Sequence, residues 1–197
     1  MITLEQVAGW SALIAAVATV IGAVTLMVFF AKGGLWGLAN DIASIVLMLA
    51  TIPVAIAVAA LEDGPQFPGN LVSLVAAIGI VSMLLAAGFQ VALVTRMRSF
   101  EALLPRTLAA GSGVGVWYLL SGLLGFPTLG APLAILAILS GVGFIAIGYG
   151  FRIGGQRHPA AAIGGAVLFV ASTTFLTWLG VLLVTDILVL EPFVGTP

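Results

Sequence analysis

The stretch TLAAGSGVGVWYLLSGLLGFPTLGAPLAILAILSGVGFIAIGYGF, residues 107–151, contains no charged side chain. At about 1.5 Å per residue, a single helix of this length would be roughly twice as long as the bilayer hydrocarbon core is thick, about 30 Å. The segment PTLGAP at 127–132 combines two prolines with a glycine, a pattern typical of a turn. The stretch therefore predicts two membrane-spanning helices, at 107–126 and 132–151.

The remainder of the chain repeats this pattern of long apolar runs between short breaks. Of the 197 residues, 62% are hydrophobic and 7% are charged, whereas soluble domains carry about 25% charged residues. Segments such as KGG at 32–34 and RMR at 96–98 separate the runs. The further runs are 8–31, 42–61, 71–95 and 160–184. We therefore predict an all-α integral membrane protein, a single transmembrane domain at 1–197 that forms a bundle of six helices joined by short loops.

Charge divides the predicted connections into two sets. All six basic residues fall in the first, third and fifth connections: Lys32, Arg96, Arg98, Arg106, Arg152 and Arg157. Acidic residues occupy the other side of the predicted path: Glu5, Glu62, Asp63, Asp186 and Glu191. Because basic loops stay in the cytoplasm, this division predicts a plasma-membrane protein with both termini outside the cytoplasm and a cytoplasmic rim formed by the six basic residues.

Composition also excludes several classes of function. The chain has no cysteine and only one histidine, His158, so it lacks the ligand set of a typical metal site. It contains no HExxH metalloprotease motif, no calcium loop and no GxxxxGK[ST] phosphate loop. A net charge of −1 gives no basis for nucleic-acid binding. We expect no metal and no cofactor, and partners limited to the lipid bilayer, further copies of the chain or other membrane subunits.

The glycines of AGSGVGV at 110–116 follow the spacing GxGxG, which differs from the dinucleotide-binding pattern GxGxxG. Gly111 and Gly115 instead form a GxxxG pair, which allows two helices to approach closely in lipid. Gly141, Gly148 and Gly164 can act in the same way. The sequence therefore predicts close helix packing at these glycines.

Three polar residues on different predicted helices form the candidate ligand-binding site. Asp41 lies at the predicted cytoplasmic start of the second helix, and Gln90 and Ser112 lie five residues inside the cytoplasmic ends of the third and fourth helices. At about 1.5 Å per residue, Gln90 and Ser112 would lie roughly 8 Å deep. Because polar groups within a membrane are costly, they often mark a ligand, lipid-headgroup or proton site.

A structural interpretation of Asp41 competes with the functional one. Asn40 or Asp41 can cap the N-terminus of the second helix, where a side-chain oxygen accepts from free backbone N–H groups. Arg96 or Arg106 can also pair with Asp41 and fix the bundle. Both interpretations stay open on the sequence alone.

Ser112 and His158 permit a third interpretation. The pair resembles the rhomboid intramembrane proteases, which place a serine early in one helix and a histidine in another. Ala110 stands where the motif of that family has glycine, and His158 lies at a helix edge. The resemblance implies an intramembrane hydrolase that uses Ser112 and His158.

Three segments resemble a broad group of small, uncharacterised bacterial multi-pass membrane proteins that share a domain of unknown function. The segments are WGLANDIASIVLMLATIPVA at 36–55, LPRTLAAGSGVGVWYLLSGLLG at 104–125 and HPAAAIGGAVLFVASTTFLTWLGVLL at 158–183. The resemblance implies a bacterial inner-membrane protein of about six helices. We expect a protein without catalytic activity, self-standing or an accessory subunit of a membrane complex. The alternative is a small transporter or lipid- or small-molecule-binding protein, and the hydrolase is third.

Overall fold

The computed structural model of the chain describes residues 3–62, 68–185 and 187–188. These residues form seven α-helices and a short 3₁₀ helix, η1, and they contain no strand. In chain order the elements are α1 (Leu4–Lys32), α2 (Leu35–Glu62), α3 (Gly69–Val94), α4 (Phe100–Leu124), α5 (Phe126–Leu129), α6 (Ala131–Gly154), η1 (Gly155–Arg157) and α7 (Pro159–Val184). All except α5 and η1 are long and apolar enough to cross a membrane, which confirms the prediction of an all-helical chain with six such segments.

Two helices begin seven residues earlier than the apolar runs predict. Helix α2 begins at Leu35 rather than at residue 42, and α4 begins at Phe100 rather than at residue 107. Ser99 caps α4, since its side chain accepts a hydrogen bond from the backbone N–H of Ala102 at 3.4 Å. A search for apolar runs locates the part of a helix that suits lipid, whereas the backbone continues as helix beyond it. The predicted turn at 127–132 overlaps α5, which begins one residue before it.

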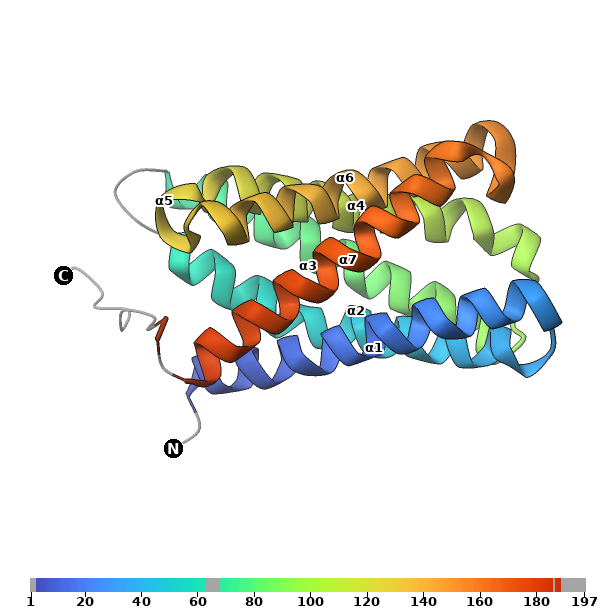
Figure 1. The fold of residues 1–197 in the computed structure, drawn as a ribbon, viewed down its shortest axis with the longest axis horizontal. Helices are drawn as coiled ribbons and strands as arrows, with labels where there is room; N and C mark the ends of the chain where they lie inside the picture. Colours follow the sequence, from blue (N-terminus) through green and yellow to red (C-terminus); the bar gives the residue numbers. More distant parts are fainter. Residues whose placement is uncertain (1–2, 63–67, 186, 189–197) are drawn as a thin grey trace.

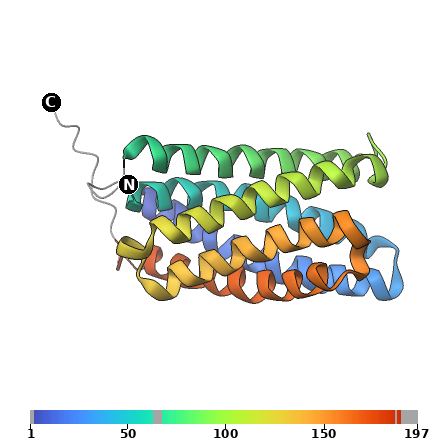
Figure 2. The same ribbon diagram turned by 90° about the horizontal axis from the view of Figure 1, so that it is seen from above.

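The six long helices form a closed ring (Figures 1 and 2). Each of α1, α2, α3, α4, α6 and α7 packs against its neighbours in the chain, and α7 returns to pack against α1. The α1–α2, α3–α4 and α6–α7 connections lie at one end of the bundle, opposite the N-terminal start of α1 (Figure 1). We call this the basic end, because it carries Lys32, Arg96, Arg98, Arg106, Arg152 and Arg157.

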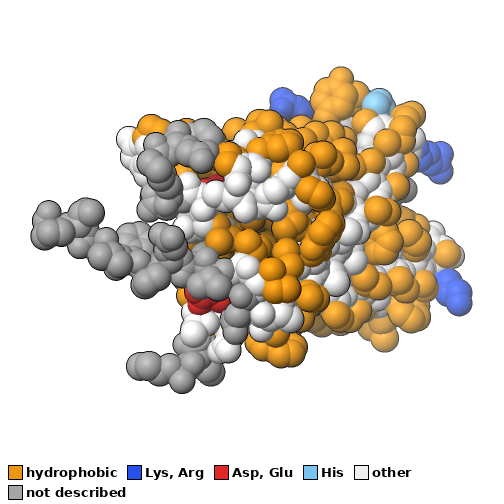
Figure 3. All heavy atoms as spheres, turned by 60° about the vertical axis from the view of Figure 1, so that its left-hand side comes forward, with side chains coloured by type: hydrophobic (Ala, Val, Ile, Leu, Met, Phe, Trp, Pro, Cys, Tyr) orange, Lys and Arg blue, Asp and Glu red, His pale blue; other side chains and the backbone are white. Residues whose placement is uncertain are grey.

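The lateral surface of the ring is apolar. Large hydrophobic side chains such as Leu74, Ile163 and Val170 are exposed on α3 and α7. Orange apolar side chains fill most of the face in Figure 3, and the red acidic side chains lie away from the blue basic ones. A surface of this kind suits contact with lipid, because the transfer of apolar side chains from water to lipid has a favourable free energy.

Glycine sets how closely the helices approach. A Cβ atom added to Gly115 would lie 2.7 Å from Cβ of Phe144 on α6, and one added to Gly141 would lie 2.5 Å from the backbone oxygen of Gly115 on α4. Gly111 faces the same helix, with its added Cβ 3.9 Å from the Phe144 ring. These contacts confirm the packing predicted for the Gly111–Gly115 pair.

Gly148 and Gly164 confirm the same prediction on α6 and α7. Gly148 lies against the Ser112 side chain of α4, and Gly164 lies against Ala146 and the backbone of α6.

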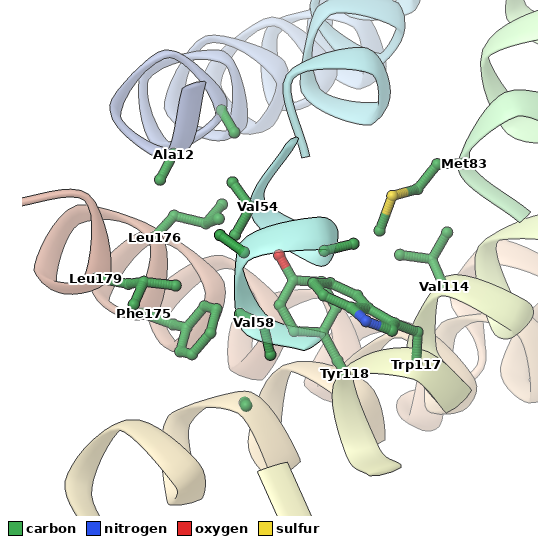
Figure 4. Packing of buried hydrophobic residues seen from close by; sticks show 14 of the residues in the cluster. Ala12, Val54, Val58, Met83, Val114, Trp117, Tyr118, Phe175, Leu176 and Leu179 are labelled. Atoms are coloured by element: carbon green, nitrogen blue, oxygen red, sulfur yellow. The ribbon is translucent and has the colours of Figure 1, made fainter. Parts of the chain in front are cut away.

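Aromatic side chains close the centre of the ring (Figure 4). Trp117 and Tyr118 of α4 are 1% and 2% exposed, and the indole of Trp117 lies against Gly79 of α3. The Tyr118 ring stacks on Phe144, with 6.0 Å between ring centroids, and meets Phe175 edge-on at 5.7 Å. These contacts join α3, α4, α6 and α7, and the aromatic side chains fill the centre of the bundle.

Candidate ligand-binding site

A cavity of about 170 Å³ lies among α2, α3, α4 and α6, in the half of the bundle toward the basic end. Its lining combines three polar side chains, several apolar ones and two glycines. The lining residues are Ser44, Met48, Ala86, Gln90, Thr107, Leu108, Gly111, Phe144, Ile147 and Gly148. Because four helices contribute, the cavity exists only when the ring is assembled.

The cavity lies inward from the helix ends at the basic end of the bundle. Gln90 precedes the end of α3 at Val94 by four residues, and Ser44 follows the start of α2 at Leu35 by nine residues. At about 1.5 Å per residue, these positions are about 6 Å and 13 Å from the ends of their helices. The cavity therefore occupies the part of the bundle nearer the basic connections.

Two oxygen atoms in this lining have no hydrogen-bond partner. Oε1 of Gln90 and Oγ1 of Thr107 are buried and unpartnered, and they are two of only four such side-chain atoms in the described part of the chain. Most buried hydroxyls here behave differently: those of Thr19, Thr51 and Ser140 donate to the backbone carbonyl one turn earlier. An unpaired buried polar atom costs about 1–3 kcal/mol, so this pair requires an explanation.

The structure brings only one of the three predicted site residues to the cavity wall. Gln90 lines the cavity, whereas Asp41 and Ser112 do not. The Ser112 hydroxyl donates to the backbone oxygen of Leu108 at 3.0 Å, and its neighbour Gly111 lines the cavity instead. Because α4 begins at Phe100, Ser112 lies about 18 Å from the helix start rather than the roughly 8 Å expected.

Asp41 lies inside α2, so the prediction that Asn40 or Asp41 caps this helix is wrong. The Asn40 side chain lies beside the Asp41 carboxylate. Among the described residues, neither Arg96 nor Arg106 forms an ion pair with it. Asp41 is placed one helical turn before Ser44 on the same face of α2, which puts it nearer the basic end than the cavity.

Sequence reasoning missed Ser44 and Thr107 as lining residues. Ser44 follows Asp41 by three residues and precedes Met48 by four, a spacing that places all three on one helix face. Thr107 stood at the predicted boundary of its helix, where a hydroxyl is unremarkable. With the boundary moved to Phe100, it becomes a polar residue in the second turn.

The cavity is closed toward the middle of the bundle. A second, smaller cavity of about 30 Å³ is lined by residues of α1, α2, α4, α6 and α7, including Thr51 and Tyr118. Met48 and Phe144 line both cavities and so lie between them. Beyond Tyr118 the core is filled by side chains such as Val58 and Phe175 (Figure 4). The larger cavity is therefore a pocket with a closed inner end rather than a channel.

Two basic residues are near lining residues in the chain. Arg106 directly precedes Thr107, and Arg152 follows Gly148 by one turn of α6. No charged side chain lines the cavity. Among the described residues, no group of three or more His, Asp or Glu side chains is placed to hold a metal ion.

The two residues of the hydrolase interpretation are each engaged with other groups. Nδ1 of His158 accepts from the backbone N–H of Ala160 at 3.2 Å and so caps the N-terminus of α7. Its ring meets Tyr149 edge-on at 6.3 Å. Ser112 donates to its own helix, as described above. In this arrangement the two side chains perform local structural roles.

Glu62, the last residue of α2, is a buried acidic residue that the sequence did not single out. It is 2% exposed and lies against Gly125 at the turn between α4 and α5, and its Oε1 has no hydrogen-bond partner among the described residues. It lies at the opposite end of the bundle from the basic residues (Figure 1). Glu62 is therefore separate from the cavity beside Gln90.

An apolar groove runs along the outside of α1 and α2. It has a volume of about 550 Å³ and is lined by residues such as Trp10, Val17 and Ile42, which are exposed at the surface. Its lining is almost entirely apolar, as expected for a surface that the acyl chains of a bilayer would fill.

No protein-family model, no curated protein and no solved structure matches this chain. The resemblance to small bacterial multi-pass membrane proteins therefore stays a prediction. The geometry of the chain establishes the fold, a ring of six long apolar helices.

Proposed function

We propose that this chain is a non-enzymatic, multi-pass plasma-membrane protein of the transporter or small-molecule-binding class. It takes a small molecule from the cytoplasm into the cavity lined by Ser44, Gln90 and Thr107. In this proposal the basic end faces the cytoplasm and both termini lie outside it, in accord with the positive-inside rule.

The unpartnered oxygens of Gln90 and Thr107 carry this proposal. They come from two adjacent helices and line the same cavity. Polar groups inside a membrane protein are expensive and are retained where they serve a function. A ligand that donates hydrogen bonds would satisfy both oxygens once the two side chains turn toward the cavity, and the volume of about 170 Å³ leaves room for one.

The position of the cavity favours access from one side. It lies in the half toward the basic end, and the aromatic side chains at the centre separate it from the other half. A binding pocket in one half of the bundle that is closed at the centre is the arrangement expected of one state of an alternating-access transporter. The same geometry suits a protein that binds a molecule without moving it.

Cysteine labelling tests this proposal directly, because the native chain has no cysteine. Ser44→Cys replaces a hydroxyl in the cavity wall by a thiol of similar size. Ile42→Cys and Val46→Cys are matched controls two residues to either side on α2, at positions 48% and 40% exposed on the outer surface. A small, uncharged thiol reagent is applied to membrane vesicles of each orientation and is quenched before it can cross the bilayer.

The expected result is labelling of Ser44→Cys from the cytoplasmic side and protection of the thiol at position 46, which lies deeper in lipid. Labelling of Ser44→Cys that is no faster than that of Val46→Cys would show that water does not reach the cavity and would refute the proposal. Labelling only from the opposite side would refute the assigned orientation.

The accessory-subunit interpretation stays a prediction with its own measurement. Native mass spectrometry of the chain extracted from its source membrane in mild detergent would reveal a stoichiometric partner if there is one. A clean monomer or a homo-oligomer would contradict it.

A further inference from the structure

The size of the cavity restricts what it can hold. Its volume is about 170 Å³, and an apolar protein cavity of about 150 Å³ holds one benzene molecule. A ligand contained in this space is therefore the size of a single ring. A lipid headgroup with its acyl chains, or a larger solute, would have to remain largely outside.

The lining also restricts the charge of the ligand. The polar side chains in the wall are Ser44, Gln90 and Thr107, all of them neutral. A charged molecule would lose its hydration here without gaining a counter-ion, which costs several kcal/mol. The nearest basic residues along the chain, Arg106 and Arg152, do not line the cavity. The wall therefore favours a neutral occupant.

The unpartnered oxygens select against a plain hydrocarbon. Oε1 of Gln90 can only accept a hydrogen bond, and Oγ1 of Thr107 can accept one. A hydrocarbon would leave both atoms unpaired, whereas a ligand with a hydroxyl or amino group can donate to one of them. Met48, Phe144 and Ile147 supply the apolar remainder of the wall, and the aromatic ring of Phe144 suits a flat partner.

From these three constraints we infer that the cavity binds a neutral, ring-sized molecule with one or two hydrogen-bond donors, of which phenol is the simplest probe. This inference rests on the proposed function, because the molecule must reach the cavity from the basic end. It adds a chemical class of ligand: an uncharged amphiphile that is polar on the side of Gln90 and Thr107 and apolar on the side of Phe144.

Protection of Ser44→Cys from labelling tests the inference at the site itself. Three probes of similar size are compared on the full-length chain in membrane vesicles: phenol, toluene and benzoate. Phenol is expected to slow the labelling of Ser44→Cys at concentrations at which toluene and benzoate do not. Met97→Cys, at an exposed position of the α3–α4 connection, is the control whose labelling no probe should slow.

Variants at Thr107 identify the hydrogen bond. In the Ser44→Cys background, Thr107→Val removes the hydroxyl while keeping the shape of the side chain. It should raise the phenol concentration that gives half-protection by about fivefold, which corresponds to the loss of one neutral hydrogen bond. Thr107→Ser keeps the hydroxyl and should change this concentration by less than about twofold. Phenol can donate its O–H to Oε1 of Gln90 while its oxygen accepts from the Thr107 hydroxyl, so Gln90→Met should reproduce the effect of Thr107→Val.

Each contrary outcome overturns a defined claim. Equal protection by toluene would show that the two oxygens do not select the ligand, and stronger protection by benzoate would place binding at the basic residues instead. If no probe protects a thiol that still reacts, the cavity does not bind this class of ligand, and the inference fails while the proposed function stands. If Ser44→Cys does not react at all, the proposed function itself has failed.

Discussion

The substitution Gly141→Ala tests one of the closest contacts between the backbones of two helices in the bundle. A Cβ atom at this position would lie 2.5 Å from the backbone oxygen of Gly115 and 2.6 Å from the backbone nitrogen of Leu119, both on α4. An ordinary contact of this kind is 3.4 Å or longer, so the shortfall is about 0.9 Å. Because both obstructing atoms belong to the backbone, no rotation of a side chain relieves the clash.

The expected loss of stability follows from this shortfall. Helices α4 and α6 must separate by close to 1 Å at this point, and a gap of 0.5–1 Å removes about a quarter to a half of the dispersion energy of each affected contact. In membranes this packing is a main source of helix association. Overpacking of a close contact typically costs about 1–3 kcal/mol, and Gly141→Ala should fall at the upper end, about 2–3 kcal/mol.

Gly88→Ala is the matched control. Gly88 lies on the outer face of α3, and a Cβ atom there would meet nothing within 4 Å. The same substitution should therefore stabilise the chain by about 0.5–1 kcal/mol, because alanine restricts the unfolded backbone more than glycine does. The two variants differ only in what surrounds the added methyl group.

Reversible unfolding in mixed micelles with increasing SDS fraction gives the free energies of unfolding. Tryptophan fluorescence can follow it, since Trp117 is buried against Gly79 and becomes exposed as the ring opens. A Gly141→Ala variant as stable as Gly88→Ala would refute the argument that backbone contact at Gly115 holds α4 and α6 together.

Three further predictions concern residues outside the cavity. His158→Ala should lower the free energy of unfolding by about 1 kcal/mol, because it removes the cap on the Ala160 N–H, while His158→Asn should retain most of the stability; equal losses would contradict a capping role. Glu62→Gln should leave thermal stability unchanged or higher, because the Glu62 Oε1 has no partner to lose among the described residues; a loss above about 1 kcal/mol would reveal a partner. A fluorophosphonate probe should not label Ser112, whose hydroxyl donates to Leu108; labelling would support the hydrolase interpretation.

Most of the architecture could be predicted from local properties of the sequence. A run of about 20 apolar residues is a membrane-spanning helix wherever it occurs, since lipid offers the backbone no other partner. The charge-free stretch at 107–151 must therefore turn once, and it does so around α5. The gathering of the basic residues at one end follows in turn, because each helix reverses the direction of the chain.

The glycine contacts were also accessible from spacing. Gly111 and Gly115 are one turn apart, so they share a helix face whatever the partner helix is. The sequence could not identify that partner. Only the ring order, in which α4 packs against α6, places Gly141 opposite Gly115.

The cavity depended on the tertiary structure. Nearly every face of these helices is apolar, so hydrophobic periodicity does not reveal which face turns inward. Gln90 faces the cavity, whereas Ser112, at a similar expected depth, turns toward Gly148 on α6. Composition thus determined that the chain is a bundle of long apolar helices. Only the packing of α2, α3, α4 and α6 decided which polar groups lie together without partners. This grouping depends on how each helix is rotated about its axis, and a sequence that is apolar on nearly every helix face does not predict that rotation.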